Sequence, residues 1–302
     1  MKRYDFLKFF EDRINYLKES GREGTALNYR RAKNSLLRFL KGKPLSFFQI
    51  DSSFAEEYSD WMKARGMVRN SISFHLRILR ALYNKGVKSG YVKQTYPFRD
   101  VYTGIDHTRK RSVDCSVIRR LKSLSLPDNS SLSIARDLFL FSIYSRGMAF
   151  VDIAFLQKRQ VSKSEIVYKR KKTGQVLRIH IEKEMRHLLD KYMPLYPESP
   201  YVFPILSYFP DEELYTAYVK SLSVYNYRLG KLAKKLGVDT KITSYTARHT
   251  WASAAYRGSV PIGVISASMG HRSEKTTRIY LDSLDDGAID RANRKVLKRL
   301  IG

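Results

Sequence analysis

The sequence contains a single cysteine, Cys115, among its 302 residues. One thiol excludes a disulfide framework and any zinc site built from several cysteines. No apolar run approaches the roughly 18 residues that a membrane-spanning helix requires. The N-terminal segment, MKRYDFLKFFEDR, interrupts its apolar residues with charges, which excludes a secretory signal. These absences predict a protein of the reducing cytoplasm.

Acidic side chains are also scarce, with 29 Asp and Glu against 56 Lys and Arg, so the formal net charge is +27. Residues 1–110 hold 23 basic and 11 acidic side chains, and the remaining residues are basic as well. So large a charge opposes compaction by self-repulsion and indicates an anionic partner. A nucleic acid clamped between two folded domains fits best, because phosphates are neutralised along an extended path. A generally basic enzyme or a ribosome-associated protein is the alternative.

The length suggests about two domains, and 43% hydrophobic residues exclude a disordered chain. Apolar residues recur at helical spacing through residues 1–95 and predict four helices there. Gly21 ends the first helix, Thr25 is the expected N-cap of the second, and Ser52 or Ser53 caps the third. We therefore expect a helical domain over residues 1–100, a linker over 101–112 and a second domain over 113–302.

Several basic side chains of the first domain and the linker are predicted to contact DNA. Three lie on the outer face of the fourth helix, and three are adjacent in the linker, where they either stay solvated or bind phosphates. No zinc finger or basic zipper is present as a smaller recognition module. These predicted contacts are Arg69, Arg77, Arg80, Arg109, Lys110 and Arg111, and Lys171 of the second domain is predicted to contact DNA as well.

The second domain is also mainly helical, with one exception. Residues 165–170 (EIVYKR) and 176–181 (VLRIHI) alternate with the period of two that is typical of strands. The sequence KKTG joins them, so we expect a β-hairpin that carries Lys171 and Lys172 at its tip. Helices are expected from about 116 to 124, 131 to 144, near 182, from 211 to 236, from 247 to 256, and from 262 onward.

No nucleotide-binding glycine loop, H-E-x-x-H motif or carboxylate cluster is present, so we expect neither a cofactor nor a catalytic metal. The remaining candidates are scattered basic, imidazole and phenol groups. Considered singly, each is more often structural: a core tyrosine, a helix-end histidine, half of an ion pair. They are Arg146, Lys172, Arg248, His271 and Tyr280.

In order and spacing, these residues resemble the tyrosine recombinase (phage integrase) family, which includes the Xer-type resolvases. Residues 245–252 (YTARHTWA) match the family's H-x-x-R-H-[TS]-[FW]-A box after its first position. Residues 269–273 (MGHRS) match [LM]-G-H-x-S, and residues 277–280 (TRIY) match T-x-x-Y. Arg146 with Asp152 resembles the first box of a sub-branch, in which Asp152 supports the arginine by charge pairing. Lys172 best matches the hairpin lysine.

The resemblance implies a mainly α, two-domain fold: a helical, SAM-like core-binding bundle and a mostly helical α+β catalytic domain with a small antiparallel hairpin. It implies site-specific recombination through a 3′-phosphotyrosyl intermediate, with Tyr280 as nucleophile. The chemistry agrees, because forked guanidinium groups of Arg146 and Arg248 suit the charge that develops on the scissile phosphate. His271 can donate one more hydrogen bond, and Lys172 can protonate the departing 5′ oxygen.

Two assignments stay open at this point. Tyr245 stands where the family has a histidine, and a phenol does not relay protons near neutral pH. We expect Tyr245 to hydrogen-bond the phosphate or Tyr280, while His249 or water moves the proton, although His249 equally fits a buried structural role. Lys171 lies next to Lys172, so the two lysines can exchange roles.

The expected partner is double-stranded DNA, so the protein is expected to associate with the nucleoid. Residues 288–301 form an amphipathic helix, which packs on its own domain or, as the resemblance implies, is donated to a neighbouring protomer in a DNA-bound homo-tetramer. Two other functions remain as alternatives. One is DNA relaxation of the type IB topoisomerase kind, and the other is DNA binding by a catalytically silent relative.

Overall fold

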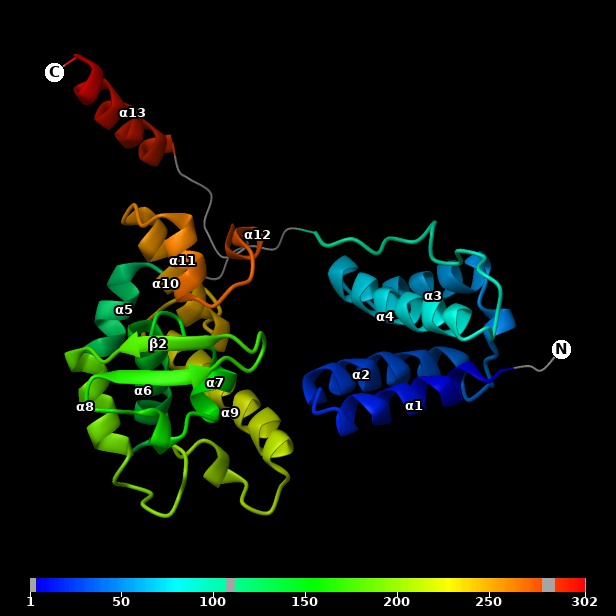
Figure 1. Cartoon of the computed structure of the whole chain (residues 1–302), viewed down its shortest axis with the longest axis horizontal. Coiled ribbons are helices and arrows are strands. Elements are labelled where there is room, and N and C mark those ends of the chain that lie inside the picture. The colour runs from blue at the N-terminus through cyan, green and yellow to red at the C-terminus, as the bar shows by residue number, and fades with distance from the viewer. Residues whose placement is uncertain (1–3, 107–111, 279–285, 302) are drawn as a thin grey trace. The chain divides into compact units, whose positions relative to one another are not determined.

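The structure is a computed structural model that describes residues 4–106, 112–278 and 286–301. The chain divides into two compact units, residues 1–108 and 109–302, here called the N-terminal unit and the C-terminal unit. Each unit has its own apolar core. Figure 1 colours the chain along its length and labels its elements.

Four helices form the N-terminal unit because each buries one apolar stripe. Helix α1 packs against α2, α3 packs against α4, and α2 also contacts α4. Inward-facing side chains such as Phe10, Leu36, Tyr58 and Leu79 are fully buried among them. The helices are α1 (Phe6–Glu19), α2 (Glu23–Leu40), α3 (Ser52–Ala64) and α4 (Arg69–Lys88), with a short 3₁₀ helix at Phe47–Gln49.

Two predicted N-caps in this unit are wrong by a few residues. Gly21, at φ +69°, reverses the chain so tightly that α2 starts at Glu23 with Arg22 as its N-cap, ahead of Thr25. Helix α3 begins at Ser52, and its N-cap is Asp51, whose carboxylate accepts a hydrogen bond of 2.8 Å from the Phe54 amide. A carboxylate caps as well as a serine hydroxyl does, so the residue type alone did not decide between them.

The C-terminal unit is built around α6, which contacts α5, α7, α8, α9 and α10. Its first elements are α5 (Cys115–Lys122), α6 (Ser131–Tyr144), α7 (Phe150–Ala154), a 3₁₀ turn (Lys158–Gln160), and strands β1 (Glu165–Lys169) and β2 (Val176–His180). Then follow α8 (Lys183–Tyr192), a 3₁₀ turn (Leu206–Tyr208), α9 (Leu214–Lys235), α10 (Ser244–Arg257), α11 (Ile262–Ser268), α12 (Glu274–Arg278) and α13 (Asp286–Ile301). The helix expected from residue 262 onward is therefore interrupted, and Gly270 at φ +63° makes the first break.

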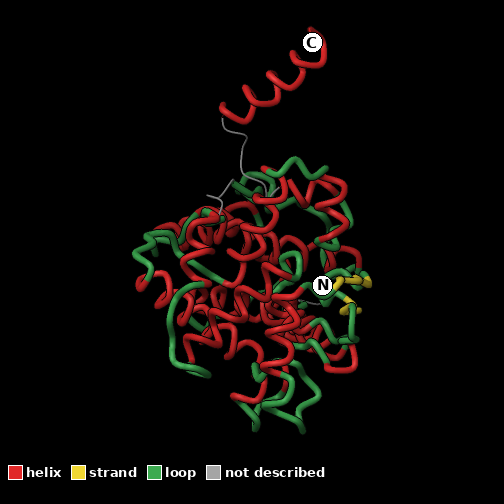
Figure 2. Tube along the Cα trace, turned by 90° about the vertical axis from the view of Figure 1, so that its left-hand side faces the viewer, coloured by secondary structure: helices red, strands yellow, loops and turns green. Residues whose placement is uncertain are grey.

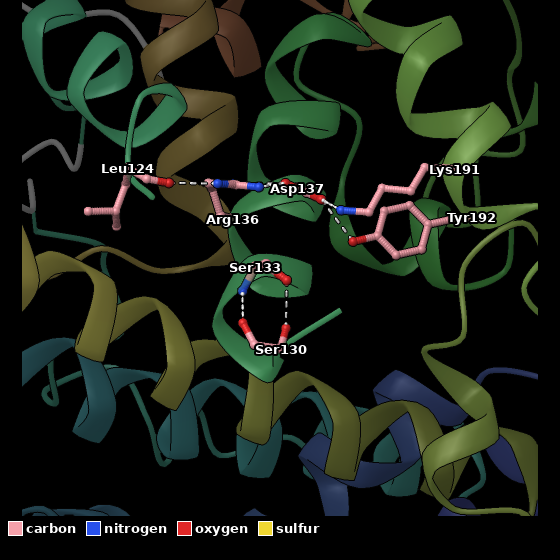
Figure 3. Close-up of polar contacts among 7 residues, drawn as sticks. All are labelled: Leu124, Ser130, Ser133, Arg136, Asp137, Lys191 and Tyr192. Carbon is pink, nitrogen blue, oxygen red and sulfur yellow. Dashed lines mark hydrogen bonds and ion pairs between the residues drawn. The ribbon is translucent and has the colours of Figure 1, made fainter. Parts of the chain in front are cut away.

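A buried polar cluster fixes α6 against α8 (Figure 3). Asp137 of α6 is 3% exposed, and its carboxylate accepts hydrogen bonds of 2.9 Å from Arg136, from Lys191 and from the Tyr192 hydroxyl. A buried carboxylate is tolerated only when it is paired in this way. The buried charge of Asp137 thus has a structural role, which is to hold α6 against α8.

Strands β1 and β2 pair antiparallel with the register Glu165–His180 to Lys169–Val176. Ile166 and Tyr168 of β1, with Leu177 and Ile179 of β2, face the core, because alternate residues of a strand point to one side. Figure 2 shows how little of the described chain is strand. The hairpin therefore covers the core with one face and carries its tip residues, 170–175, beyond the paired strands.

Candidate active site

Arg146 lies in a tight turn immediately after α6. Its backbone has φ +59° and that of Gly147 has φ +72°, and the Gly147 amide donates to the Ser142 carbonyl at 2.8 Å. A left-handed backbone costs a non-glycine residue roughly 1–2 kcal/mol. The Arg146 side chain reaches the hairpin, where its guanidinium donates to the Arg178 carbonyl at 3.4 Å. The first predicted arginine thus lies on a strained turn facing the hairpin.

Arg248 lies in the second turn of α10 and is 3% exposed. Its guanidinium donates to the carbonyls of Gly147 and Met269, each at 2.6 Å, and to Nε2 of His271 at 3.0 Å. A side chain on Gly147 would place its Cβ 3.1 Å from the Arg248 Cα, so the Arg146 turn packs directly on α10. One arginine therefore joins three segments that are far apart in the sequence.

His271, in the turn between α11 and α12, is a neutral imidazole with both ring nitrogens hydrogen-bonded. Because a guanidinium only donates, Nε2 of His271 accepts from Arg248, and Nδ1 carries the proton and donates to Thr277 Oγ1 at 2.9 Å. Burial, then the charges of Arg248, Arg170 and Lys172, lower the pKa of His271 to about 3. The Thr277 hydroxyl can also donate, so it can support the other tautomer, which presents Nε2–H.

The two lysines of the hairpin tip have different surroundings. Lys171 places its ammonium 4.0 Å from the centre of the Phe155 ring, and its amide donates to the Asp152 carboxylate at 2.8 Å. The charge of Lys172 instead contributes to the lowered pKa of His271. Lys171 therefore faces Phe155, whereas Lys172 adds positive charge in the neighbourhood of His271.

Arg170 is a buried cation at this site that sequence reasoning missed. It is 4% exposed, and its guanidinium donates to the Gly270 carbonyl. A signal for it exists in the sequence. Ile166, Tyr168 and Arg170 alternate along one strand, so the period of two that predicted the strand also turns Arg170 inward.

The charges of three arginines act on the buried side chain of Tyr168. Burial raises the pKa of Tyr168 and the Asp152 charge raises it further, whereas the charges of Arg248, Arg170 and Arg146 lower it. Asp152 is itself 4% exposed, and burial raises its pKa against the opposing effects of the Lys171 amide and the neighbouring cations. The site is therefore a basic cluster with one buried carboxylate.

Tyr245 lies in the first turn of α10 and is 45% exposed. Its ring centroid is 6.4 Å from that of His249, one turn later on the same helix. The Thr243 amide donates to the Thr246 hydroxyl at 2.9 Å and stabilises the start of α10. Tyr245 is thus partly exposed at the start of α10, one turn before His249.

The predicted nucleophile, Tyr280, lies outside the described residues, as do Arg109, Lys110 and Arg111. Helix α12 leads the chain toward residue 280, and its fully buried Thr277 is bonded to His271.

The three α4 arginines predicted to contact DNA are engaged within the N-terminal unit. Arg77 donates to the Gly104 carbonyl at 3.0 Å, Arg80 donates to Thr103 Oγ1 at 2.7 Å, and Arg69 lies 3.7 Å from the centre of the Tyr102 ring. They hold residues 102–106, here called the strap, against α4. Residues 102–106 of the expected linker are thus bound to the first unit, and a DNA role for these arginines stays a prediction.

Two family models match the chain. The one described as "Phage integrase SAM-like domain" matches residues 5–101, and the one described as "Phage integrase family" matches residues 117–286. The second spans more than half of the 302 residues. The chain belongs to the phage integrase family. This membership confirms the predicted resemblance, the mainly helical fold class and the enzyme class, a tyrosine site-specific recombinase.

Relatives of this integrase-family chain are found among proteins and among solved structures. Tyrosine recombinase XerC of Leptospira interrogans is 25% identical over 277 residues, covering 89% of this chain and 86% of that protein. Tyrosine recombinase XerA of Pyrococcus horikoshii is 22% identical over 266 residues, covering 76% of this chain and 89% of that protein. The Tn1549 transposon integrase in complex with a circular intermediate DNA has a TM-score of 0.69 at 14% identity, covering 97% of this chain and 100% of that one. A lambda integrase tetramer bound to a Holliday junction has a TM-score of 0.68 at 14% identity, covering 92% of this chain and 78% of that one. The solved structures therefore share the fold of this chain.

Two absences apply to the part of the integrase chain that the structure describes. No three His, Cys, Asp or Glu side chains gather there as a metal site would require, and no helix there is long and apolar enough to cross a membrane.

Proposed function

We propose that this chain cuts and rejoins double-stranded DNA at specific sites, with Tyr280 as the nucleophile. The observation that carries the proposal is the position of Arg248. Arg248 extends from helix α10 and donates hydrogen bonds to Gly147, in the Arg146 turn, and to Met269 and His271. Three separate segments therefore meet at its guanidinium group. A scissile phosphate is the anion that such a cluster suits, because forked guanidinium groups bind phosphate oxygens in pairs.

The proposed reaction is a transfer between two phosphate esters. The Tyr280 oxygen attacks phosphorus and forms the 3′-phosphotyrosyl bond, while the bond from phosphorus to the 5′ oxygen breaks. The Tyr280 proton leaves to His249 or water, and the Lys172 ammonium gives a proton to the departing 5′ oxygen. Arg146 and Arg248 stabilise the charge that grows on the non-bridging oxygens. The reverse steps rejoin the strand, because the new ester keeps the energy of the broken one.

Two side chains are proposed to assist at the phosphate. In the tautomer with Nε2–H, which the Thr277 hydroxyl can support, His271 donates to a non-bridging oxygen in place of accepting from Arg248. Tyr245, exposed at the start of α10, hydrogen-bonds the phosphate or Tyr280. The surroundings of Lys172 support it as the acid, because its charge already acts on His271.

We further propose that four copies assemble on DNA by exchanging α13. The last two turns of this helix expose apolar side chains that a monomer in water leaves uncovered. They are Val296, Leu297, Leu300 and Ile301. The structurally similar lambda integrase is a tetramer on a Holliday junction, which is the kind of assembly that this helix would support.

The deciding experiment uses a nicked DNA site from which the cleaved 5′ fragment diffuses away, so that a covalent adduct accumulates. We expect an adduct with the native chain and none with Tyr280→Phe. Tyr227→Phe, at an exposed tyrosine of α9, is the matched control and should keep adduct formation within about twofold. An adduct that survives Tyr280→Phe contradicts the nucleophile assignment, and no adduct with the native chain indicates a silent relative.

Strand exchange is tested separately from cleavage. Two marked plasmids that each carry the site should yield recombinants. Relaxation of one plasmid without recombinants would instead indicate an activity of the topoisomerase kind.

A further inference from the structure

Arg170 closes the hairpin tip. It follows the last paired residue of β1, its amide donates to the Gln175 carbonyl, and its own carbonyl accepts from the Gly174 amide, both at 2.8 Å. Residues 171–174 therefore form a short loop anchored at Arg170. Lys172 lies within that loop, two residues from the anchor.

The Arg170 side chain attaches this loop to the His271 turn. Its guanidinium donates to the Gly270 carbonyl, which Thr173 Oγ1 also contacts at 3.4 Å. A Cβ on Gly270 would lie 3.2 Å from Cδ of Arg170, so the aliphatic part of the arginine packs directly on this glycine. Across the same junction, Arg272 donates to the Thr173 carbonyl at 2.9 Å. The tip and the turn are thus joined as one unit.

Burying a guanidinium carries a large desolvation cost unless something compensates the charge. The charge of Arg170 acts on the buried Asp152, whose Oδ1 accepts a hydrogen bond from the Lys171 amide. Within the described residues, neither Oδ2 of Asp152 nor Nε of Arg170 has a hydrogen-bond partner. A fold that required only stability would place an apolar side chain at the end of this strand, as it does at Ile166 and Tyr168. Retaining a buried charge here indicates a role beyond packing.

We propose that Arg170 is a positioning residue for the cleavage reaction, holding the loop of Lys172 against the turn of His271. The inference rests on the proposed function, in which Lys172 protonates the 5′ oxygen while His271 contacts the same phosphate. Arg170 is 4% exposed and its guanidinium donates to the Gly270 carbonyl, so in this proposal it acts through Lys172 and not on the phosphate itself. Its loss therefore weakens proton delivery to the leaving group and leaves DNA affinity in place.

The test replaces the 5′ bridging oxygen at the cleavage site by sulfur. A thiol has a reference pKa of about 8.5, so a thiolate departs without a proton. On the oxygen site, Arg170→Met should lower the cleavage rate by about 100-fold, as expected when a catalytic group is displaced. On the sulfur site the rate should return to near the native value. Site affinity should change by less than about twofold throughout.

Two comparisons keep the outcome interpretable. Arg170→Lys, which keeps the charge and can donate to Gly270, should lose less than Arg170→Met and covers the case in which the methionine variant does not fold. Arg178→Met removes an exposed cation from the same hairpin, ion-paired with Glu165 at 3.1 Å, and should leave both rates near native.

Each contrary result has its own meaning. If the Arg170→Met defect is equally large on the sulfur site, or if DNA affinity falls by the same factor, Arg170 does not act through the acid and the inference is wrong. If Lys172→Ala is not rescued by sulfur either, the acid assignment of the proposed function fails instead.

Discussion

At the scale of single residues, the site depends on two adjacent left-handed backbones, Arg146 and Gly147. The chain needs this sharp reversal because α6 ends and α7 begins within six residues. Strain at Arg146 persists because its neighbours hold it in place: the Gly147 carbonyl accepts from Arg248, and the Gly147 amide is bonded to Ser142. Strain of this kind is concentrated at functional sites, where surrounding contacts fix a geometry that the chain does not favour by itself.

Gly147→Ala should therefore destabilise the protein by about 2–4 kcal/mol. An alanine at φ +72° is strained, and its Cβ would also lie 3.1 Å from Arg248 Cα, where backbone has to move. Urea denaturation measures the loss, and adduct formation should fall with it because Arg248 shifts.

The matched control is Gly237→Ala at the end of α9. It has a positive φ of +59° but nothing within 4 Å of the added Cβ. It should cost only the backbone strain, about 1 kcal/mol, and keep adduct formation. Equal losses in the two variants would show that the packing of the turn on α10 contributes nothing.

At the scale of elements, the strap changes the role of α4. Ser73, Arg77 and Asn70 of α4 all bond strap residues, and Asn70 does so twice: its Nδ2 donates to the Asp106 carbonyl at 3.0 Å and its Oδ1 accepts from the Asp106 amide at 2.8 Å. The Asn70 amide thus pairs with both the N–H and the C=O of Asp106, as a neighbouring β-strand would. Helix α4 thus defines where the chain leaves the N-terminal unit.

Asn70→Ala should loosen the strap without unfolding the helix. Two hydrogen bonds of about 0.5–1.5 kcal/mol each are lost, so amide hydrogen exchange at residues 103–106 should accelerate about tenfold or more.

Asn84→Ala is the control on the same helix, because Oδ1 of Asn84 accepts a hydrogen bond of 3.0 Å from the Gln94 side chain, outside the strap. In Asn84→Ala, amide hydrogen exchange at residues 103–106 should match that of the native protein. Unchanged exchange in Asn70→Ala would show that Asn70 does not help to hold the strap.

At the scale of the whole molecule, the excess positive charge is shared by both units, and the C-terminal helix carries apolar surface instead. An exposed apolar side chain gains roughly 1.5–3 kcal/mol when a partner buries it fully. The four exposed residues at the end of α13 are therefore sufficient to support a protein–protein contact.

Replacing Val296, Leu297, Leu300 and Ile301 together by serine should abolish four-copy assembly on two DNA sites, measured by sedimentation. Binding of one chain to one site should remain within about twofold, since these residues lie outside the basic cluster.

Asn293→Ser, at an exposed polar position of the same helix, serves as the control and should assemble like the native chain. A tetramer that survives the fourfold substitution would exclude α13 as the connection between copies.

Local pattern alone was sufficient for much of this protein. Amphipathic spacing predicted the helices of the N-terminal unit, and alternation predicted the hairpin, because both signals lie within a few neighbouring residues. The spacing of the motifs around Arg248, His271 and Tyr280 predicted the family, since reaction chemistry restricts which residue types can serve.

Other features were decided only by the tertiary structure. Arg170 bonds Gly270 across 100 positions, and Arg248 bonds Gly147 across 101. No local pattern records which distant carbonyl a guanidinium will meet, nor that the Lys171 ammonium lies over the Phe155 ring. The α4 arginines show the same limit, because a basic helix face has the same sequence pattern whether it binds DNA or the strap. The sequence thus determined which chemical groups are present, and the packing of distant segments determined which of those side chains come together in one site.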